Sequence, residues 1–159
     1  EMISELLRYQ LYGGNQKVSI LQEIDYLKTY IALRKLRMSE RLRLRVEFPP
    51  ELNELNIYPL LFLPLVENAF KYVGGDYQLD IIMKWENNRI SLFIRNSIPE
   101  LSAEDEALRK SVDERQRKGI GLVNLRRRLS LLYPNKHRLE TRKEETEFVA
   151  ELMIEIEEI

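Results

Sequence analysis

Hydrophobic residues return every three or four positions in four stretches of the chain, and this spacing predicts four helices. The expected ranges are 2–12, roughly 20–40, about 58–72, and a last helix that resumes after Gly119. Ser19 and Gln22 form a capping-box pair at the start of the second helix. The apolar stripe of that helix is broad: Ile20, Ile24, Leu27, Ile31 and Met38, widened by Tyr26, Tyr30 and Leu33. Such breadth indicates burial against more than one neighbour, either in the core or at a dimer contact.

Other stretches alternate between apolar and polar residues, which is typical of strands with one buried face. The expected strands are 42–48, 78–86, 89–95, about 137–143 and 146–156. Asn87-Asn88 predicts a hairpin turn, and Glu144-Glu145 joins the last two strands. The polar, aperiodic segment 97–118 is long for a loop in a compact domain, which favours a functional lid or a disordered segment.

The order of elements is helices, strand, helix, hairpin, loop, helix, hairpin. Strands joined mainly as hairpins favour a mixed or antiparallel sheet with helices on one face. The predicted fold class is therefore α+β, a two-layer α/β sandwich with an N-terminal helical extension.

Composition narrows the function classes. Hydrophobic residues make up 44% of the 159 residues, enough for a packed core. Lys and Arg total 25 against 26 Asp and Glu, a net charge of −1, which argues against a strongly basic domain built to neutralise a run of phosphates and leaves a local basic patch open. Cysteine is absent and His137 is the single histidine, so thiolate chemistry and multi-histidine metal sites are excluded.

The start of the chain predicts a fragment of a longer protein. No apolar run approaches the ~18 residues that cross a bilayer, and no signal peptide is present. Instead an amphipathic pattern begins at once with Ile3, Leu6 and Leu7, as in a helix cut partway along. A membrane-anchored parent is compatible with this pattern.

Glu67, Asn68 and Lys71 share the polar face of an otherwise apolar predicted helix, because spacings of three and four align on a helix. A carboxylate, an amide oxygen and a cation together suit a hydrated Mg²⁺ and phosphate groups. The alternative is a solvated face with a Glu67–Lys71 ion pair.

Gly119 and Gly121 precede the last predicted helix in Lys118-Gly119-Ile120-Gly121-Leu122. Glycines at a helix start leave backbone N–H groups accessible at its positive end, where phosphate binds. The alternative is an ordinary helix-entry turn.

Asn96 ends a predicted strand in Arg95-Asn96-Ser97-Ile98-Pro99. Its amide is able to hydrogen-bond the edge of a nucleobase. The alternative is a strand-terminating turn.

Taken in order, these motifs resemble the ATP-binding domain of sensor histidine kinases. Pro-Leu-Val-Glu-Asn-Ala-Phe-Lys at 64–71 is followed by a hairpin, a long loop and Gly-Ile-Gly-Leu-Val-Asn-Leu-Arg-Arg-Arg-Leu at 119–129. More narrowly, the chain resembles LytS/YehU-type sensor histidine kinases. The front half, from Leu6 to Arg34, is similar to that family's linker between phosphoacceptor helix and ATPase domain. The resemblance spans nearly the whole chain.

The resemblance implies a Bergerat-type (GHKL) sandwich, also found in gyrase and MutL. It implies a helical linker or dimerisation segment at 1–40 and an ATP-binding catalytic domain at 41–159. The implied cofactors are ATP and Mg²⁺. The implied partners are a response regulator receiver domain and a second copy of the parent, with no nucleic acid. The implied location is the cytoplasmic part of an inner- or plasma-membrane protein.

The resemblance also implies residue roles. Asn68 is the expected Mg²⁺ ligand, and Glu67 the catalytic carboxylate that polarises water or orients the site. Lys71 approaches the phosphates. Gly119 and Gly121 wrap the phosphate chain, and Leu122 follows them in the nucleotide-binding set, with the dipole of the next helix as support. Asn96 stands where the nucleobase is recognised.

Two departures from the family pattern bear on function. The usual Asp-x-Gly-x-Gly box is here Asn96-Ser97-Ile98-Pro99-Glu100, and a neutral amide is a weaker acceptor than a carboxylate. The phosphoacceptor histidine is expected upstream of Glu1, so the fragment is not expected to autophosphorylate in the family's manner.

Three functions therefore remain open. The leading expectation is the catalytic part of a two-component sensor kinase. The second is a degenerate nucleotide-binding module that signals through protein contacts without phosphotransfer. The third is a related serine kinase of anti-sigma type or an ATPase, which the tyrosine-rich linker helix argues against.

Overall fold

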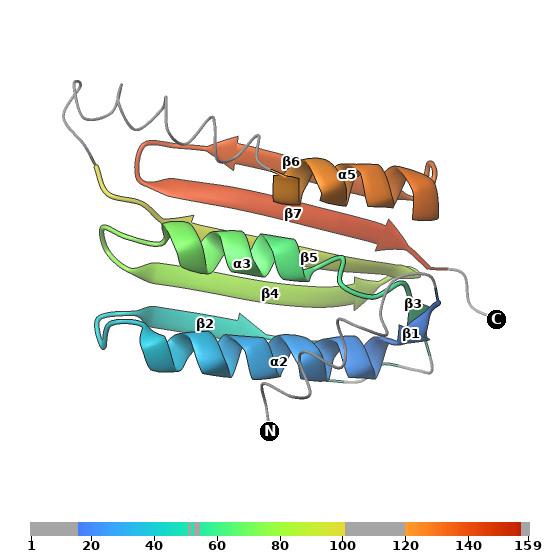
Figure 1. The fold of residues 1–159 in the computed structure, drawn as a ribbon, viewed down its shortest axis with the longest axis horizontal. Coiled ribbons are helices and arrows are strands. Elements are labelled where there is room, and N and C mark those ends of the chain that lie inside the picture. The colour runs from blue at the N-terminus through green and yellow to red at the C-terminus, as the bar shows by residue number, and fades with distance from the viewer. Residues whose placement is uncertain (1–15, 51, 53–54, 101–119, 157–159) are drawn as a thin grey trace.

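The computed structural model describes residues 16–50, 52, 55–100 and 120–156. Within these residues a five-stranded sheet carries helices α2, α3 and α5 on one face, with α3 between the other two (Figure 1). This arrangement confirms the predicted α+β two-layer sandwich. The expected helix 2–12 and residues 101–118 of the expected loop lie outside the described residues.

The sheet is mixed, with strand order β2-β4-β5-β7-β6. Its strands are β2 Arg43–Glu47, β4 Gln78–Glu86, β5 Arg89–Ser97, β6 His137–Lys143 and β7 Glu147–Glu155. β2 runs parallel to β4, and the other neighbours are antiparallel. The parallel pair needs a crossover connection, and α3 (Leu63–Tyr72) lies within it.

The β4–β5 hairpin turns at Asn87-Asn88, as the sequence predicts. Both residues have positive φ, 51° and 61°. Two consecutive residues with left-handed backbone conformation match the twist of a hairpin, and asparagine tolerates this conformation better than most residues. The turn fixes a register that places Asn96 opposite Leu79 of β4, and the next pairing places it opposite Phe148 of β7.

Helix α2 spans Ile20–Arg37, within the predicted range of 20–40. Ser19 caps it: the Leu21 N–H donates to the Ser19 hydroxyl oxygen at 3.2 Å. The buried part of its predicted stripe (Ile20, Ile24, Tyr26, Leu27 and Ile31) lies in the hydrophobic core. Core packing therefore accounts for these residues, and the dimer contact that the breadth of the stripe also allowed stays a prediction.

The predicted start of the third helix, near Tyr58-Pro59, is wrong. Asn56–Ile57 forms a short strand, β3, that pairs antiparallel with β1 (Val18–Ser19). Leu60 then adopts a φ of 63°, which a helix does not allow, so α3 begins only at Leu63 with Pro64 in its first turn.

The core lies between the sheet and the helices. Inward-facing residues of β4, β5 and β7 pair across the strands, as with Met83, Leu92 and Leu152. Helix α5 (Ile120–Leu132) adds Leu125 and Leu129, from the face that the sequence predicts to be apolar. Among the described helices, none combines the length and the apolar character needed to cross a membrane.

Candidate functional site

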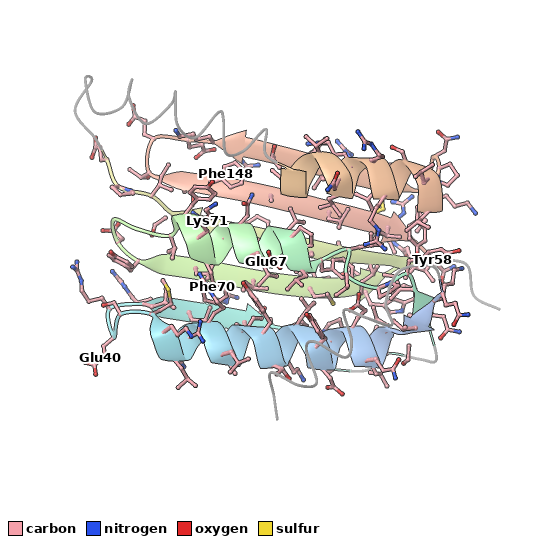
Figure 2. All side chains as sticks on the ribbon, viewed as in Figure 1. Glu40, Tyr58, Glu67, Phe70, Lys71 and Phe148 are labelled. Carbon is pink, nitrogen blue, oxygen red and sulfur yellow. The ribbon has the colours of Figure 1, made fainter. Side chains whose placement is uncertain are left out.

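Helix α3 presents an apolar face to the core and a polar face away from it. Leu65, Val66 and Ala69 are buried, whereas Glu67 and Lys71 are exposed and Asn68 is half-buried. Figure 2 shows Glu67 and Lys71 along α3, with Phe70 on the side that faces α2. The structure therefore brings the three predicted polar residues onto one helix surface.

Glu67 lies beside α2. Partial burial raises the pKa of the Glu67 carboxyl above its ordinary value, and the nearby Arg34 guanidinium of α2 opposes that rise. Tyr30 of α2 also interacts with Glu67, and its pKa is raised by burial and by the charge of Glu67. Sequence reasoning missed the contribution of Arg34 to this site, because the partner lies on another helix.

Lys71 does not pair with Glu67. Its Nζ lies 5.5 Å from the ring centroid of the neighbouring Tyr72, and no ion pair joins Lys71 to Glu67, both of which the structure describes. The predicted alternative of a Glu67–Lys71 ion pair is therefore not what this surface shows. Lys71 extends toward solvent, where an anion is accessible to it.

Asn96 is buried beneath the helical layer, with 1% of its surface exposed. Asn96 lies two residues from both Ile94 and Ile98, which are also buried, and residues two apart point to the same side of an extended chain. Its side chain is therefore on the helix-covered face. Its Nδ2 donates to the Ser97 carbonyl oxygen at 3.4 Å, a long and weak hydrogen bond. The amide oxygen keeps its capacity to accept a hydrogen bond.

The segment after Asn96 is locked to the end of α3. The Gly74 N–H donates to the Ser97 carbonyl oxygen at 2.9 Å, and the Ser97 hydroxyl donates to the Gly74 carbonyl oxygen at 2.7 Å. Gly75 has a φ of 62°, and a Cβ there would lie 2.7 Å from the Ile98 carbonyl oxygen. Only glycine fits this close approach, which joins the Asn96 segment to the helix that carries Asn68.

Helix α5 is in contact with α3. Gly121 in its first turn is exposed, and among the described residues no atom outside its own helical turn and chain neighbours lies within 4 Å of the position where its Cβ would be. Leu122 packs partly against the core. Gly119 lies outside the described residues, so the structure does not place it.

Oxygen ligands for a cation are sparse here. Across the described ranges, no group of three or more His, Asp or Glu side chains is arranged to hold a metal ion. A Mg²⁺ bound at Asn68 would therefore depend on water and phosphate oxygens for the rest of its shell, which is the usual preference of this ion. The donor set fits a metal that arrives with a nucleotide.

A surface hollow of about 390 Å³ lies elsewhere, over the helix-free side of β5, β6 and β7. Its lining includes Arg89, Phe93, Arg138, Glu140 and Glu151, and none of the predicted site residues. His137 is also remote from the site chemistry: its Nδ1 donates to the Tyr133 carbonyl oxygen at 2.7 Å. The residues on α3, β5 and α5 remain the candidate site.

The known proteins that this chain is similar to include sensor histidine kinases. The family model described as "Histidine kinase" matches residues 1–42. The sensor protein kinase HptS of Staphylococcus aureus (strain USA300) is 27% identical over 144 residues, which cover 87% of this chain. The chain spans 28% of the length of that relative.

Solved structures share the fold. The mycobacterial sensor histidine kinase MprB superposes with a TM-score of 0.57 at 13% identity, covering 92% of this chain and 100% of that one. The catalytic domain of histidine kinase ThkA gives 0.55 at 17% identity, covering 88% and 95%. The chain is thus similar in sequence to sensor histidine kinases, and its fold is that of their catalytic domains.

Proposed function

We propose that this chain is the ATP-binding catalytic part of a two-component sensor histidine kinase of LytS/YehU type. The proposal is supported most by one arrangement: α3, which carries Glu67, Asn68 and Lys71, is in contact both with α5 and with β5, the strand that holds the buried Asn96. A metal-binding amide, a cation, accessible helix-start N–H groups and a buried amide are the groups that a magnesium nucleotide requires.

Each residue has a role in the proposal. Asn68 contributes its amide oxygen to Mg²⁺, and Lys71 approaches the phosphates from the end of α3. Gly119, Gly121 and Leu122 bring the positive end of α5 to the phosphate chain. Asn96 accepts a hydrogen bond from the nucleobase. Bound Mg²⁺ neutralises charge on the phosphate oxygens.

Glu67 is the proposed catalytic carboxylate. Its raised pKa, with Arg34 opposing the rise, is the kind of perturbation found at functional sites. It precedes Asn68 by one residue on α3, so in the proposal it lies next to the phosphate site. The phosphoryl group is proposed to pass to a histidine of the parent protein upstream of Glu1, and from there to a response regulator.

The remaining features of the proposal concern the parent protein. Residues 1–40 are proposed as the linker and dimerisation segment, and 41–159 as the ATP-binding domain. The parent is proposed to act as a homodimer anchored at the membrane, with this domain in the cytoplasm.

Calorimetric titration with ADP and with a non-hydrolysable ATP analogue, each with and without Mg²⁺, tests the proposal. We expect Mg²⁺-dependent binding that is lost in Asn68→Ala and weakened in Lys71→Ala. Asn56→Ala and Lys84→Ala, at exposed positions on β3 and β4, are matched controls and should bind normally. Unchanged affinity in Asn68→Ala would remove the assignment of the metal site.

One observation favours a second candidate, a module that keeps the fold and signals through protein contacts. The base-recognition position holds a neutral amide, and its Nδ2 is already directed to the Ser97 carbonyl. A full-length parent that binds ATP without transferring phosphate to its own histidine would favour this second function. Phosphotransfer to histidine would exclude it.

A further inference from the structure

The turn that leads into α3 is held by charged side chains from two other helices. The Leu60 N–H donates to the carboxylate of Glu23 in α2. The Arg128 guanidinium of α5 donates to the Pro59 carbonyl oxygen at 3.1 Å and, more weakly, to the Leu60 carbonyl oxygen at 3.4 Å. The backbone of Leu60 is therefore engaged from α2 through its N–H and from α5 through its C=O.

Pro64 in the first turn of α3 is one local device that favours the start of the helix, but it does not engage the Leu60 backbone. Phe62, at the N-cap of α3, makes no side-chain capping hydrogen bond. Leu60 has a φ of 63°, a conformation that a side-chain-bearing residue holds only when its surroundings impose it. The contacts that engage the Leu60 backbone thus come from Glu23 and Arg128, which lie 37 and 68 residues from Leu60 in the sequence.

The two side chains also depend on each other. Glu23 is 2% exposed, and a carboxylate at that depth is costly unless charge and hydrogen bonds compensate it. Burial lowers the pKa of Arg128, while the charge of Glu23 raises it again. Among the described residues, Tyr133 is a further titratable group that interacts with Glu23, and its hydroxyl oxygen accepts from the Tyr58 N–H at 3.1 Å.

The location of the pair connects three elements. Helix α3 lies between α2 and α5 (Figure 1), and Tyr58 marks the end of the molecule where the turn precedes α3 (Figure 2). Helix α2 lies within residues 1–42, which match the histidine kinase family model. Helix α5 carries Gly121 in its first turn and Arg128 in its second half. A shift of either helix is therefore able to act on the Leu60 peptide as well as on α3 through the direct contacts of these helices.

We propose that Glu23 and Arg128 are positioning residues that link α2 to α5 through the Leu60 backbone and thereby set how α3 presents Glu67, Asn68 and Lys71. The structural part of this proposal is that the two residues position α3, and it does not depend on any ligand. Its consequence for ligand affinity rests on the proposed function, in which the polar face of α3 binds the nucleotide.

Backbone amide NMR of the ligand-free chain tests the structural part. Glu23→Gln keeps the shape and an acceptor oxygen but removes the charge, and Arg128→Lys keeps the charge but removes the planar fork. We expect both variants to shift the amide signals of Leu60 and of α3 through Lys71. Asp25→Asn and Arg127→Gln, exposed neighbours on the same two helices, should leave α3 unchanged. Shifts that stop at Phe62 in both variants would overturn the proposal.

Nucleotide affinity tests the consequence. We expect Glu23→Gln and Arg128→Gln each to weaken binding of the ATP analogue about tenfold, with Arg128→Lys recovering part of the loss. The double variant should lose little more than either single variant, because the two residues act through one backbone unit. Thermal unfolding checks that each variant is folded at the assay temperature.

The outcomes separate the two proposals. If the unmodified chain fails to bind nucleotide, the proposed function fails, and the α3 amide shifts still decide the positioning role. If the unmodified chain binds and both single variants bind equally well, the positioning role is contradicted while the proposed function stands. Losses that add fully in the double variant would show two independent contacts and would also contradict the proposed link.

Discussion

The guanidinium of Arg34 in α2 lies over the ring of Phe70 in α3, with its central carbon 5.7 Å from the ring centroid. Tyr30 meets the same ring edge-on, with centroids 6.3 Å apart. The Arg34 Nε is buried and has no hydrogen-bond partner in the described part of the chain. The aromatic contact holds the cation between the two helices, where it interacts with Glu67 three residues before Phe70.

This relationship predicts the titration of Glu67. Replacing Arg34 with Gln should raise the pKa of the Glu67 carboxyl further, because burial already raises it and the opposing cation would be gone. An NMR titration of the side-chain carboxyl carbon measures the change. Lys35→Gln, an exposed neighbour on α2, is the control and should have no effect. A pKa that stays the same or falls in Arg34→Gln would contradict the interaction.

The same carboxyl predicts a pH dependence of stability. A raised native pKa means that the folded state binds the proton more tightly than the unfolded chain. The stabilisation from this proton is complete at low pH and is lost as the pH rises through the native pKa. The stability of Glu67→Gln, measured relative to the unmodified chain, should therefore increase as the pH rises from acidic to neutral. The gain should be small because Glu67 is exposed to solvent.

Urea unfolding of both chains over this pH range measures the difference. Glu40→Gln, which replaces an exposed carboxylate, should give a flat difference. A Glu67→Gln variant that loses stability progressively toward neutral pH would show that the native state favours the ionised carboxyl instead.

The conformation of the hairpin turn predicts that two substitutions at Asn88 change the stability of the fold by different amounts. Its φ of 61° suits glycine and disfavours a residue with a branched side chain. Asn88→Gly should keep the stability within about 0.5 kcal/mol, whereas Asn88→Val should cost about 1–2 kcal/mol. Thermal or urea unfolding measures both, with Lys84→Val on the neighbouring strand as a control for the new side chain. Equal stability of the two Asn88 variants would argue against the left-handed turn.

Restoring a carboxylate at position 96 should separate affinity from stability. In Asn96→Asp, a charged acceptor should bind the nucleobase amine more tightly, by about tenfold if the charged bond adds about 1.4 kcal/mol. The ligand-free variant should be less stable, because residue 96 is 1% exposed and a charge at that depth is costly to bury. Calorimetry and thermal unfolding measure the two effects. An Asn96→Asp variant with weaker ATP-analogue binding would remove Asn96 from the proposed base contact.

Local patterns in the sequence were enough to predict most of the elements. The alternation of β4, β5, β6 and β7 requires only that one face of each strand is buried, and the Asn87-Asn88 pair fixes the first hairpin by its own conformational preference. The stripe of α2, its Ser19 cap and the apolar face of α5 are also local. The order of the polar motifs supplied the candidate site residues Glu67, Asn68, Lys71 and Asn96.

Only the tertiary structure decided what holds these elements together. The pairing of Val18–Ser19 with Asn56–Ile57, the left-handed Leu60 and the fit of Gly75 against Ile98 each depend on a partner distant in the sequence. The sequence places Glu23 beside apolar residues of α2, which is a signal of burial, but it does not name Leu60 and Arg128 as its partners. The reason is physical. Periodicity along a chain records which face of an element is buried, whereas hydrogen bonds and charges between elements depend on where packing brings their backbones.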